Sequence, residues 1–173
     1  MTAPLLVTYA SRTGSTAEIA QAIGQTLSAA GLPVDVQPMQ AVHDLAPYRA
    51  VVAGSAVRGS RWLPEAAAFI QAQRLTLAQK PLALFTVCIT LAMGSASQYR
   101  SAVAGWVAPV RAQVRPVSEA FFAGRLDFSR LPWNWDTLGL RAAVALKIFP
   151  KDDRRDWEAV RAWAAALPPL LAN

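Results

Sequence analysis

Short apolar runs recur along the chain and are separated by longer stretches with helical periodicity. Three of these runs suit buried strands: 4–10, 48–57 and 81–90. Each is rich in strand-forming residues and is bounded by polar or glycine residues. Residues 34–39 alternate between apolar and polar positions, which is typical of a strand exposed on one side, and 117–123 form a last short run. The pattern predicts five strands.

The stretches between these strands predict helices. Ile19, Ile23 and Leu27 recur at four-residue spacing, and the helix that they form is expected to end at Gly31. Further helices are expected at 64–77, 95–114 and 154–167. Parallel strands need long crossover connections, which helices usually supply. The alternation therefore predicts an α/β fold, a doubly wound parallel sheet with helices on both faces.

The length and hydrophobic content limit the number of domains. With 173 residues, 54% of them hydrophobic, the chain can bury one sizeable core, and we expect a single domain over residues 1–173. Its apolar stretches are shorter than the roughly 18 residues that suggest a membrane span, and no signal region opens it, so we expect a cytoplasmic protein. The one cysteine, Cys88, excludes an intramolecular disulfide and a cysteine-built metal site.

The balance of charged residues indicates which classes of partner the protein could bind. The chain has 17 Lys and Arg against 11 Asp and Glu, a formal net charge of +6. Such an excess is compatible with acidic substrates, anionic lipid or nucleic acid. Residues 100–151 alone hold eight cations and three acids, which is either a surface that attracts carboxylates or a solvated basic face.

A loop rich in hydroxyl residues lies between the first strand and the first helix. Ser11, Thr13, Ser15 and Thr16 place hydroxyl groups there, and Gly14 would let backbone amides approach an anion. In a doubly wound sheet this turn is where a phosphate meets a helix N-terminus. The loop lacks both a GxGxxG pattern and the lysine of a P-loop, which favours a monophosphate. A helix capped by Ser or Thr, with no ligand, is the alternative.

Residues 11–16 (SRTGST) resemble the phosphate loop of flavodoxins, which has the form (S/T)-x-T-G-x-T after the first strand. The resemblance implies a flavodoxin-like sandwich with a five-stranded parallel sheet in the order 2-1-3-4-5, and FMN as the cofactor. The residues that it implies as the phosphate site are Ser11, Arg12, Thr13, Gly14, Ser15 and Thr16. The side chain of Arg12 either reaches the phosphate or points outward.

The same resemblance implies two loops beside the flavin ring, at 54–64 and 86–99. They follow neighbouring strands, whose carboxyl ends meet at one edge of the sheet. The residues expected there are Ser55, Ala56, Val57, Arg58 and Gly59 from the first loop and Val87, Cys88, Ile89 and Thr90 from the second. Trp62 either stacks on the ring or is a partly buried surface aromatic. Cys88 is expected to be a buried apolar residue without a redox role.

The end of the chain resembles a narrower family. Residues 120–167 look like the closing part of the menaquinone-dependent protoporphyrinogen oxidases, in which a strand ending in AG precedes an aromatic and basic insertion and a final helix. Residues 54–59 (GSAVRG) are similar to the G-A-S-I-R pattern of that family, with Arg58 at its arginine. The resemblance implies an FMN-dependent oxidoreductase of haem biosynthesis, which takes hydrogens from a porphyrinogen and passes electrons to a quinone. It implies no catalytic side chain that can be named.

Two other functions stay open. Residues 87–94 lack the aromatic and acidic residues usual in the second ring loop of flavodoxin electron carriers, and such carriers are acidic. An electron carrier with a redox partner protein is one alternative, and an interaction module without tight FMN binding is another. No nucleic-acid partner is expected, and a homodimer is left open.

The segment 131–149, within an insertion at 124–153, is unusual in composition. It includes Trp133 and Trp135 before an apolar helix expected at 136–149, which also carries Arg141 and Lys147. This composition suits a peripheral contact with the inner face of a membrane, where a lipid quinone is met. Packing against the sheet edge or a second subunit is the alternative.

Overall fold

A parallel sheet forms the centre of the computed structural model, which describes residues 3–93, 96–125, 138, 142, 145–146 and 153–172. Its strands are β1 (Leu5–Ala10), β2 (Val34–Pro38), β3 (Ala50–Arg58), β5 (Leu82–Cys88) and β6 (Ser118–Ala123). Their order is β2-β1-β3-β5-β6, with every one of these neighbours parallel. This confirms the predicted fold and the order 2-1-3-4-5. The two-residue strand β4 (Arg61–Trp62), which pairs antiparallel with the end of β3, was not predicted.

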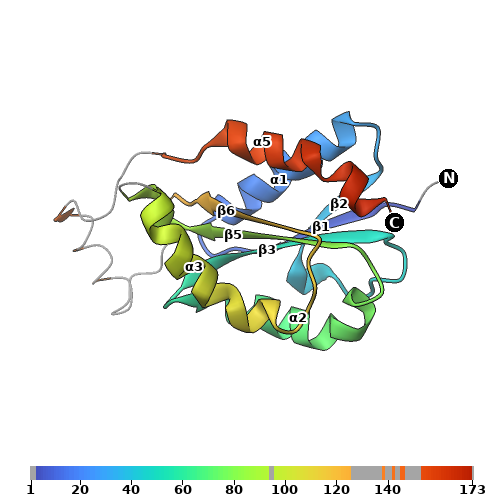
Figure 1. The fold of residues 1–173 in the computed structure, drawn as a ribbon, viewed down its shortest axis with the longest axis horizontal. Coiled ribbons are helices and arrows are strands. Elements are labelled where there is room, and N and C mark those ends of the chain that lie inside the picture. Colours follow the sequence, from blue (N-terminus) through green and yellow to red (C-terminus); the bar gives the residue numbers. More distant parts are fainter. Residues whose placement is uncertain are drawn as a thin grey trace.

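Helices cover both faces of the sheet (Figure 1). On one face lie α1 (Ser15–Ala29) and α5 (Trp157–Ala166), and on the other lie α2 (Pro64–Leu77) and α3 (Ala96–Arg111). Short 3-10 turns complete the described chain at η1 (Met39–Ala41), η2 (Ile89–Ala92) and η4 (Pro168–Leu171). Helix α5 begins three residues later than the predicted 154, because Asp156 caps it by accepting a hydrogen bond from the Ala159 N–H at 2.8 Å.

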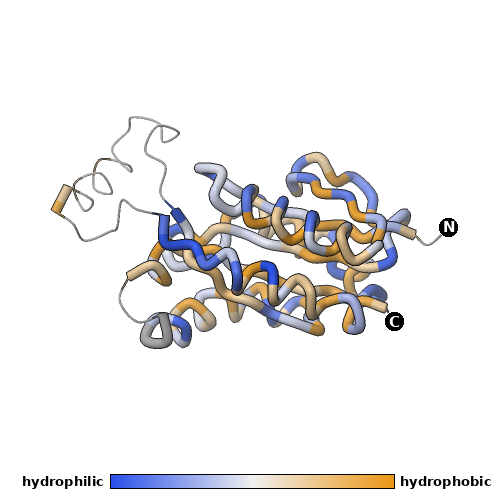
Figure 2. The backbone as a smooth tube through the Cα atoms, turned by 90° about the horizontal axis from the view of Figure 1, so that it is seen from above, coloured by the Kyte–Doolittle hydropathy of each residue, from blue (hydrophilic) through white to orange (hydrophobic). Residues whose placement is uncertain are grey.

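The core is divided by the sheet into two layers. Successive strand residues point to opposite faces, so Leu6 of β1 packs with α2 and α3 while Leu5 and Val7 pack with α1 and α5. Figure 2 shows the resulting pattern, in which hydrophobic and hydrophilic colours alternate along the helices. The sheet also needs one glycine, because a Cβ on Gly54 would lie 2.1 Å from the ring of Phe85.

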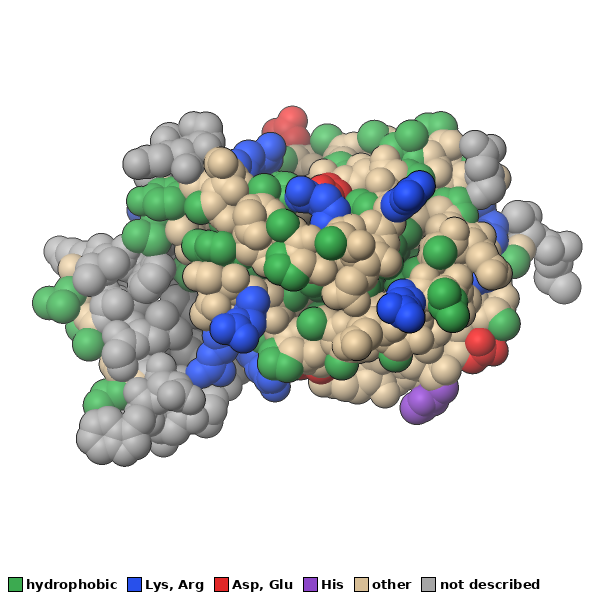
Figure 3. Space-filling model, turned by 60° about the horizontal axis from the view of Figure 1, so that its bottom comes forward, with side chains coloured by type: hydrophobic (Ala, Val, Ile, Leu, Met, Phe, Trp, Pro, Cys, Tyr) green, Lys and Arg blue, Asp and Glu red, His purple; other side chains and the backbone are tan. Residues whose placement is uncertain are grey.

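The face that carries α2 and α3 shows several Lys and Arg side chains and few acidic ones (Figure 3). This surface accords with the net charge of +6. No helix in the described part of the chain is long and apolar enough to cross a bilayer. The predicted interfacial segment 131–149 lies outside the described residues except for four positions, among which Leu138 and Leu146 are exposed. Membrane contact, a homodimer and the single domain stay predictions.

Candidate functional site

The loops predicted to bind a cofactor leave the sheet at one edge. The register places Ala10, the last residue of β1, beside Ser55 of β3, and Ala56 of β3 beside Val87 of β5. The carboxyl ends of these three neighbouring strands therefore meet, as Figure 1 shows at the end of the sheet opposite the N-terminus. The loop at 11–14, the β3–β4 hairpin and η2 all start from this edge.

Gly14 sets the geometry of the first loop. It is the N-cap of α1 and has φ 90° and ψ −16°, the left-handed conformation that glycine adopts without strain. Its N–H donates a hydrogen bond to Ser11 Oγ at 3.1 Å, and its carbonyl accepts from the Glu18 N–H at 3.0 Å. The alternative of a Ser or Thr side-chain cap is therefore wrong, because α1 has no side-chain cap. Among the described residues, the amides of α1 that precede Glu18 have no hydrogen-bond partner, so they are available to an anion.

The hydroxyl groups of the loop have different roles. Ser15 Oγ accepts a hydrogen bond from the Arg125 N–H at 3.0 Å, and Ser11 Oγ accepts from Gly14, so both are engaged within the protein. Thr16 is only 1% exposed, and its Oγ1 has no hydrogen-bond partner among the described residues. A buried hydroxyl without a partner costs about 1–3 kcal/mol. A phosphate oxygen at the start of α1 would supply the missing partner.

Arg12 points away from the helix start. Its Nη2 lies 3.0 Å from Glu65 Oε2 at the beginning of α2. The outward orientation is therefore the one observed. The ion pair is partly exposed and so contributes little to stability, but it joins the first loop to the element that follows the β3–β4 hairpin.

The first predicted ring loop is the β3–β4 hairpin. Its tip has Gly59 at φ 56° and Ser60 at φ 58°, both in the left-handed region. Ala56 and Val57 are half-buried, and Arg58 and Gly59 are exposed, so a ligand at this edge can reach these four residues. Ser55 is fully buried, and its Oγ donates to the Ala56 carbonyl and accepts from the Leu63 N–H. Its hydroxyl holds the hairpin together.

Trp62 is buried, so the prediction of a partly buried surface aromatic is wrong, and almost none of its ring is exposed for stacking on a flavin. Its side chain is 2% exposed, and its indole Nε1 donates a hydrogen bond to Thr86 Oγ1 at 3.0 Å. It packs in the core layer on the α2 and α3 face. The cause is β4, which turns the chain back along β3 and thereby directs Trp62 inward.

The second predicted ring loop begins where β5 ends. Val87 and Cys88 belong to β5 and are buried, whereas Ile89 and Thr90 start η2 and are half-buried. Cys88 packs with Leu91 and Val103, which confirms the prediction of a buried apolar residue. Contact with a ligand at this edge therefore falls to Ile89 and Thr90.

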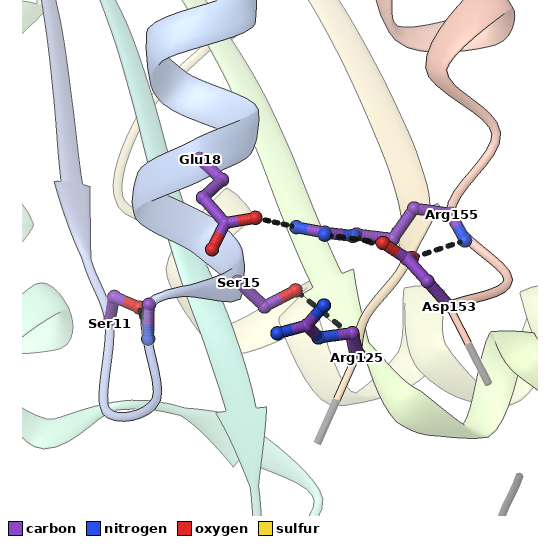
Figure 4. Close-up of polar contacts among 7 residues, drawn as sticks. Ser11, Ser15, Glu18, Arg125, Asp153 and Arg155 are labelled. Atoms are coloured by element: carbon purple, nitrogen blue, oxygen red, sulfur yellow. Dashed lines mark hydrogen bonds and ion pairs between the residues drawn. The ribbon is translucent and has the colours of Figure 1, made fainter. Parts of the chain in front are cut away.

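An ion cluster that sequence reasoning missed lies beside the first turn of α1 (Figure 4). Arg155, whose side chain is 3% exposed, donates through Nη1 to Glu18 Oε2 at 2.6 Å and through Nε to Asp153 Oδ1 at 2.8 Å. These hydrogen bonds raise the pKa of Arg155 and lower the pKa of Asp153. Arg155 and Glu18 lie 137 positions apart, so no local pattern could reveal the pair.

Known proteins share this architecture. A flavodoxin from the domain Archaea is 16% identical, with 98% of this chain and 99% of that chain covered and a TM-score of 0.59. A flavodoxin mutant from Pseudomonas aeruginosa is 19% identical, with the same coverage and TM-score. Oxidised Flavodoxin 2 from Bacillus cereus is 22% identical, with 84% and 99% covered and a TM-score of 0.53. At these identities the structures show the fold alone.

Sequence comparison gives the family. No curated protein sequence matches the chain. The family model of the flavodoxin domain matches residues 6–141, which is more than half of the chain and includes the hydroxyl loop, the hairpin and η2. The chain therefore belongs to the flavodoxin domain family.

Proposed function

We propose that this protein binds FMN without a covalent bond and acts as an electron-transfer protein of the flavodoxin type. FMN is the cofactor of the flavodoxin family, so the family membership supports the predicted cofactor. The observation that carries the proposal is the buried Oγ1 of Thr16, which has no partner in the described part of the chain and lies in the first turn of a helix that begins at a left-handed glycine.

The phosphate of FMN fits the start of α1. The amides of a helix's first turn carry a partial positive charge, which favours an anion there. Gly14 has no side chain to obstruct that approach, and Thr16 Oγ1 is a hydroxyl donor already removed from water. Thr13 is half-buried in the same loop and would contribute a second hydroxyl. Ser11 and Ser15 would instead keep the loop in shape.

The flavin ring would lie between the loops that leave β3 and β5. Residues 56–59 from the hairpin and Ile89 and Thr90 from η2 are the accessible predicted positions. When bound, FMN supplies one- and two-electron chemistry that no side chain of this protein can supply. The side chains of this chain would bind and orient the cofactor and exclude water from part of it. The partner would be a protein with an acidic face, since this chain carries a net charge of +6.

Protoporphyrinogen oxidation is a narrower proposal. It depends on the resemblance of residues 120–167, much of which lies outside the described residues, and none of the matches above is an enzyme of that kind. The electron-carrier role depends instead on the family membership of most of the chain. We therefore favour the carrier.

One experiment separates these functions. The FMN-loaded protein is reduced without oxygen and mixed in turn with an acidic redox protein, with a menaquinone analogue, and with protoporphyrinogen plus that analogue. Fast oxidation by the redox protein at low salt, with no porphyrin formed, is expected of a carrier. If porphyrin forms faster with the protein than without it, the proposed function is protoporphyrinogen oxidation and not electron transfer. If the protein is colourless and cannot be reconstituted with FMN, an interaction module without tight FMN binding is the remaining function.

A further inference from the structure

Two carboxylates lie close to the proposed phosphate site. Glu18 is in the first turn of α1, and its N–H makes that helix's first hydrogen bond to the Gly14 carbonyl. Asp153 reaches the same turn from the far end of the chain through Arg155 (Figure 4). A phosphate group carries between one and two negative charges at neutral pH. Both carboxylates would therefore repel it unless their charge is balanced.

Arg155 lies between the two carboxylates and contacts both. Its Nη1 lies 2.6 Å from Glu18 Oε2, while Nε and Nη2 both donate to the Asp153 carboxylate. The guanidinium is also 4.4 Å from the centre of the Trp157 ring, an arrangement in which a cation is attracted to the aromatic face. The carboxylates are more exposed than the arginine, with 46% and 32% of their side-chain surface open against 3%. The buried member of the cluster is thus the cation.

We infer that Arg155 is a positioning residue of the FMN phosphate site, which neutralises Glu18 and Asp153 so that the first turn of α1 can accept a phosphate. This inference rests on the proposed function. According to this inference, a residue in the last part of the chain influences how strongly the loop near its beginning prefers a flavin that carries a phosphate. Arg155 would act through the two carboxylates, because Nε, Nη1 and Nη2 each donate a hydrogen bond to one of them.

The remaining groups around the cluster support this assignment. Hydrogen bonding to Arg155 is the main cause of the lowered pKa of Asp153, and the charge of Arg125 lowers it further, so Asp153 stays ionised at neutral pH. Arg125 also holds the site by its backbone, since its N–H donates to Ser15 Oγ at 3.0 Å. Without Arg155, the carboxylates of Glu18 and Asp153 would lie beside the first turn of α1 with less positive charge near them.

The test compares FMN with riboflavin, which lacks the phosphate, in phosphate-free buffer. Arg155→Gln should weaken FMN binding about tenfold while riboflavin binding changes by less than about twofold. Adding Glu18→Gln to that variant should recover most of the FMN affinity. Arg161→Gln is the control, because Arg161 is an exposed arginine within α5, and among the contacts of the described residues its side chain bonds only its own helix, at the Trp157 carbonyl. It should leave both affinities unchanged.

Glu18→Gln alone separates an effect of charge from the loss of a structural contact. Glu18 is half-exposed, so this variant should fold even if Arg155→Gln does not. Charge neutralisation predicts an FMN-to-riboflavin affinity ratio about threefold above that of the unmodified protein. A ratio that is unchanged or lower, as loss of a structural tether would give, overturns the inference. If Arg155→Gln weakens the binding of FMN and of riboflavin equally, the inference is overturned as well.

The failure of the proposed function would look different. If the unmodified protein binds neither flavin, the proposed function fails, and the same variants are then titrated with inorganic phosphate while the melting temperature is followed. The inference then predicts that phosphate stabilises the unmodified protein and Glu18→Gln more than Arg155→Gln. Equal responses of all variants would overturn it.

Discussion

The indole Nε1 of Trp62 donates a hydrogen bond to Thr86 Oγ1 at 3.0 Å, and both residues are 2% exposed. Trp62 belongs to β4, the return strand of the first ring loop, and Thr86 belongs to β5, from which the second ring loop starts. This buried hydrogen bond therefore joins the two loops that would lie beside a flavin. It fixes their relative position before any cofactor binds.

Replacing Trp62 by Phe should lower the free energy of unfolding by about 1–3 kcal/mol, because a buried hydroxyl on Thr86 loses its partner. The measurement is urea denaturation of the flavin-free protein. Trp163→Phe is the matched control: it also loses an indole hydrogen bond, to Ser118 Oγ at 2.9 Å, but at a half-buried site. A cost for Trp62→Phe no larger than that of the control would contradict the role of this hydrogen bond.

Gly54→Ala should destabilise the fold, since the new Cβ would lie 2.1 Å from the Phe85 ring in the middle of the sheet. Overpacking of this kind costs about 1–3 kcal/mol. Gly105→Ala is the opposite case, because that glycine lies within α3 and nothing stands within 4 Å of an added Cβ. It should raise stability by about 0.5–1 kcal/mol. Thermal unfolding of the two variants should therefore shift the melting temperature in opposite directions.

The Asp153–Arg155 pair predicts a pH dependence of stability. An unfolded aspartate titrates near pH 4, and the hydrogen bond with Arg155 lowers the pKa of folded Asp153, so ionised Asp153 favours the folded state above about pH 4. That contribution is lost as the pH falls through the folded value. Asp153→Asn should therefore cost about 1–2 kcal/mol at pH 7, and progressively less below pH 4. Unfolding curves of both proteins that differ equally at pH 7 and pH 3 would contradict this.

The sequence predicts the centre of the sheet well because β1, β3 and β5 are mostly buried. The run at 81–90 becomes β5 at Leu82–Cys88, and the predicted helix at 64–77 is α2, with Pro64 at its first turn. Burial on both faces requires unbroken apolar sequence, which is visible without a structure. The glycine loop before α1 is visible for a similar reason, since only a few residue types adopt its backbone.

The rest depends on contacts that no local pattern contains. A two-residue strand such as β4 is too short to show periodicity, so the burial of Trp62 could not be foreseen. The pairing of Arg155 with Glu18 joins the two ends of the chain, and a run of charged residues at 151–156 is equally typical of an exposed turn. The different roles of Ser15 and Thr16 depend on Arg125, which arrives from β6.

Thr16→Val tests the observation on which the proposed function rests, the buried Oγ1 of Thr16. The side chains have nearly the same shape, so the substitution removes only a buried hydroxyl that has no partner among the described residues. The flavin-free protein should be as stable or slightly more stable, while FMN binds about tenfold more weakly, the effect of one hydrogen bond to a charged group. Thr8→Val is the control, because Thr8 Oγ1 is also buried without a described partner but lies inside β1.

The most direct measurement is a titration of the purified protein with FMN and with riboflavin, followed by absorption and fluorescence. The proposal that the start of α1 holds the phosphate predicts that FMN binds at least about a hundredfold more tightly than riboflavin, as several hydrogen bonds to one anion would give. It further predicts that Thr16→Val narrows this ratio and that Thr8→Val does not. Equal affinities for the two flavins, or a ratio that Thr16→Val leaves unchanged, would contradict the proposed phosphate site.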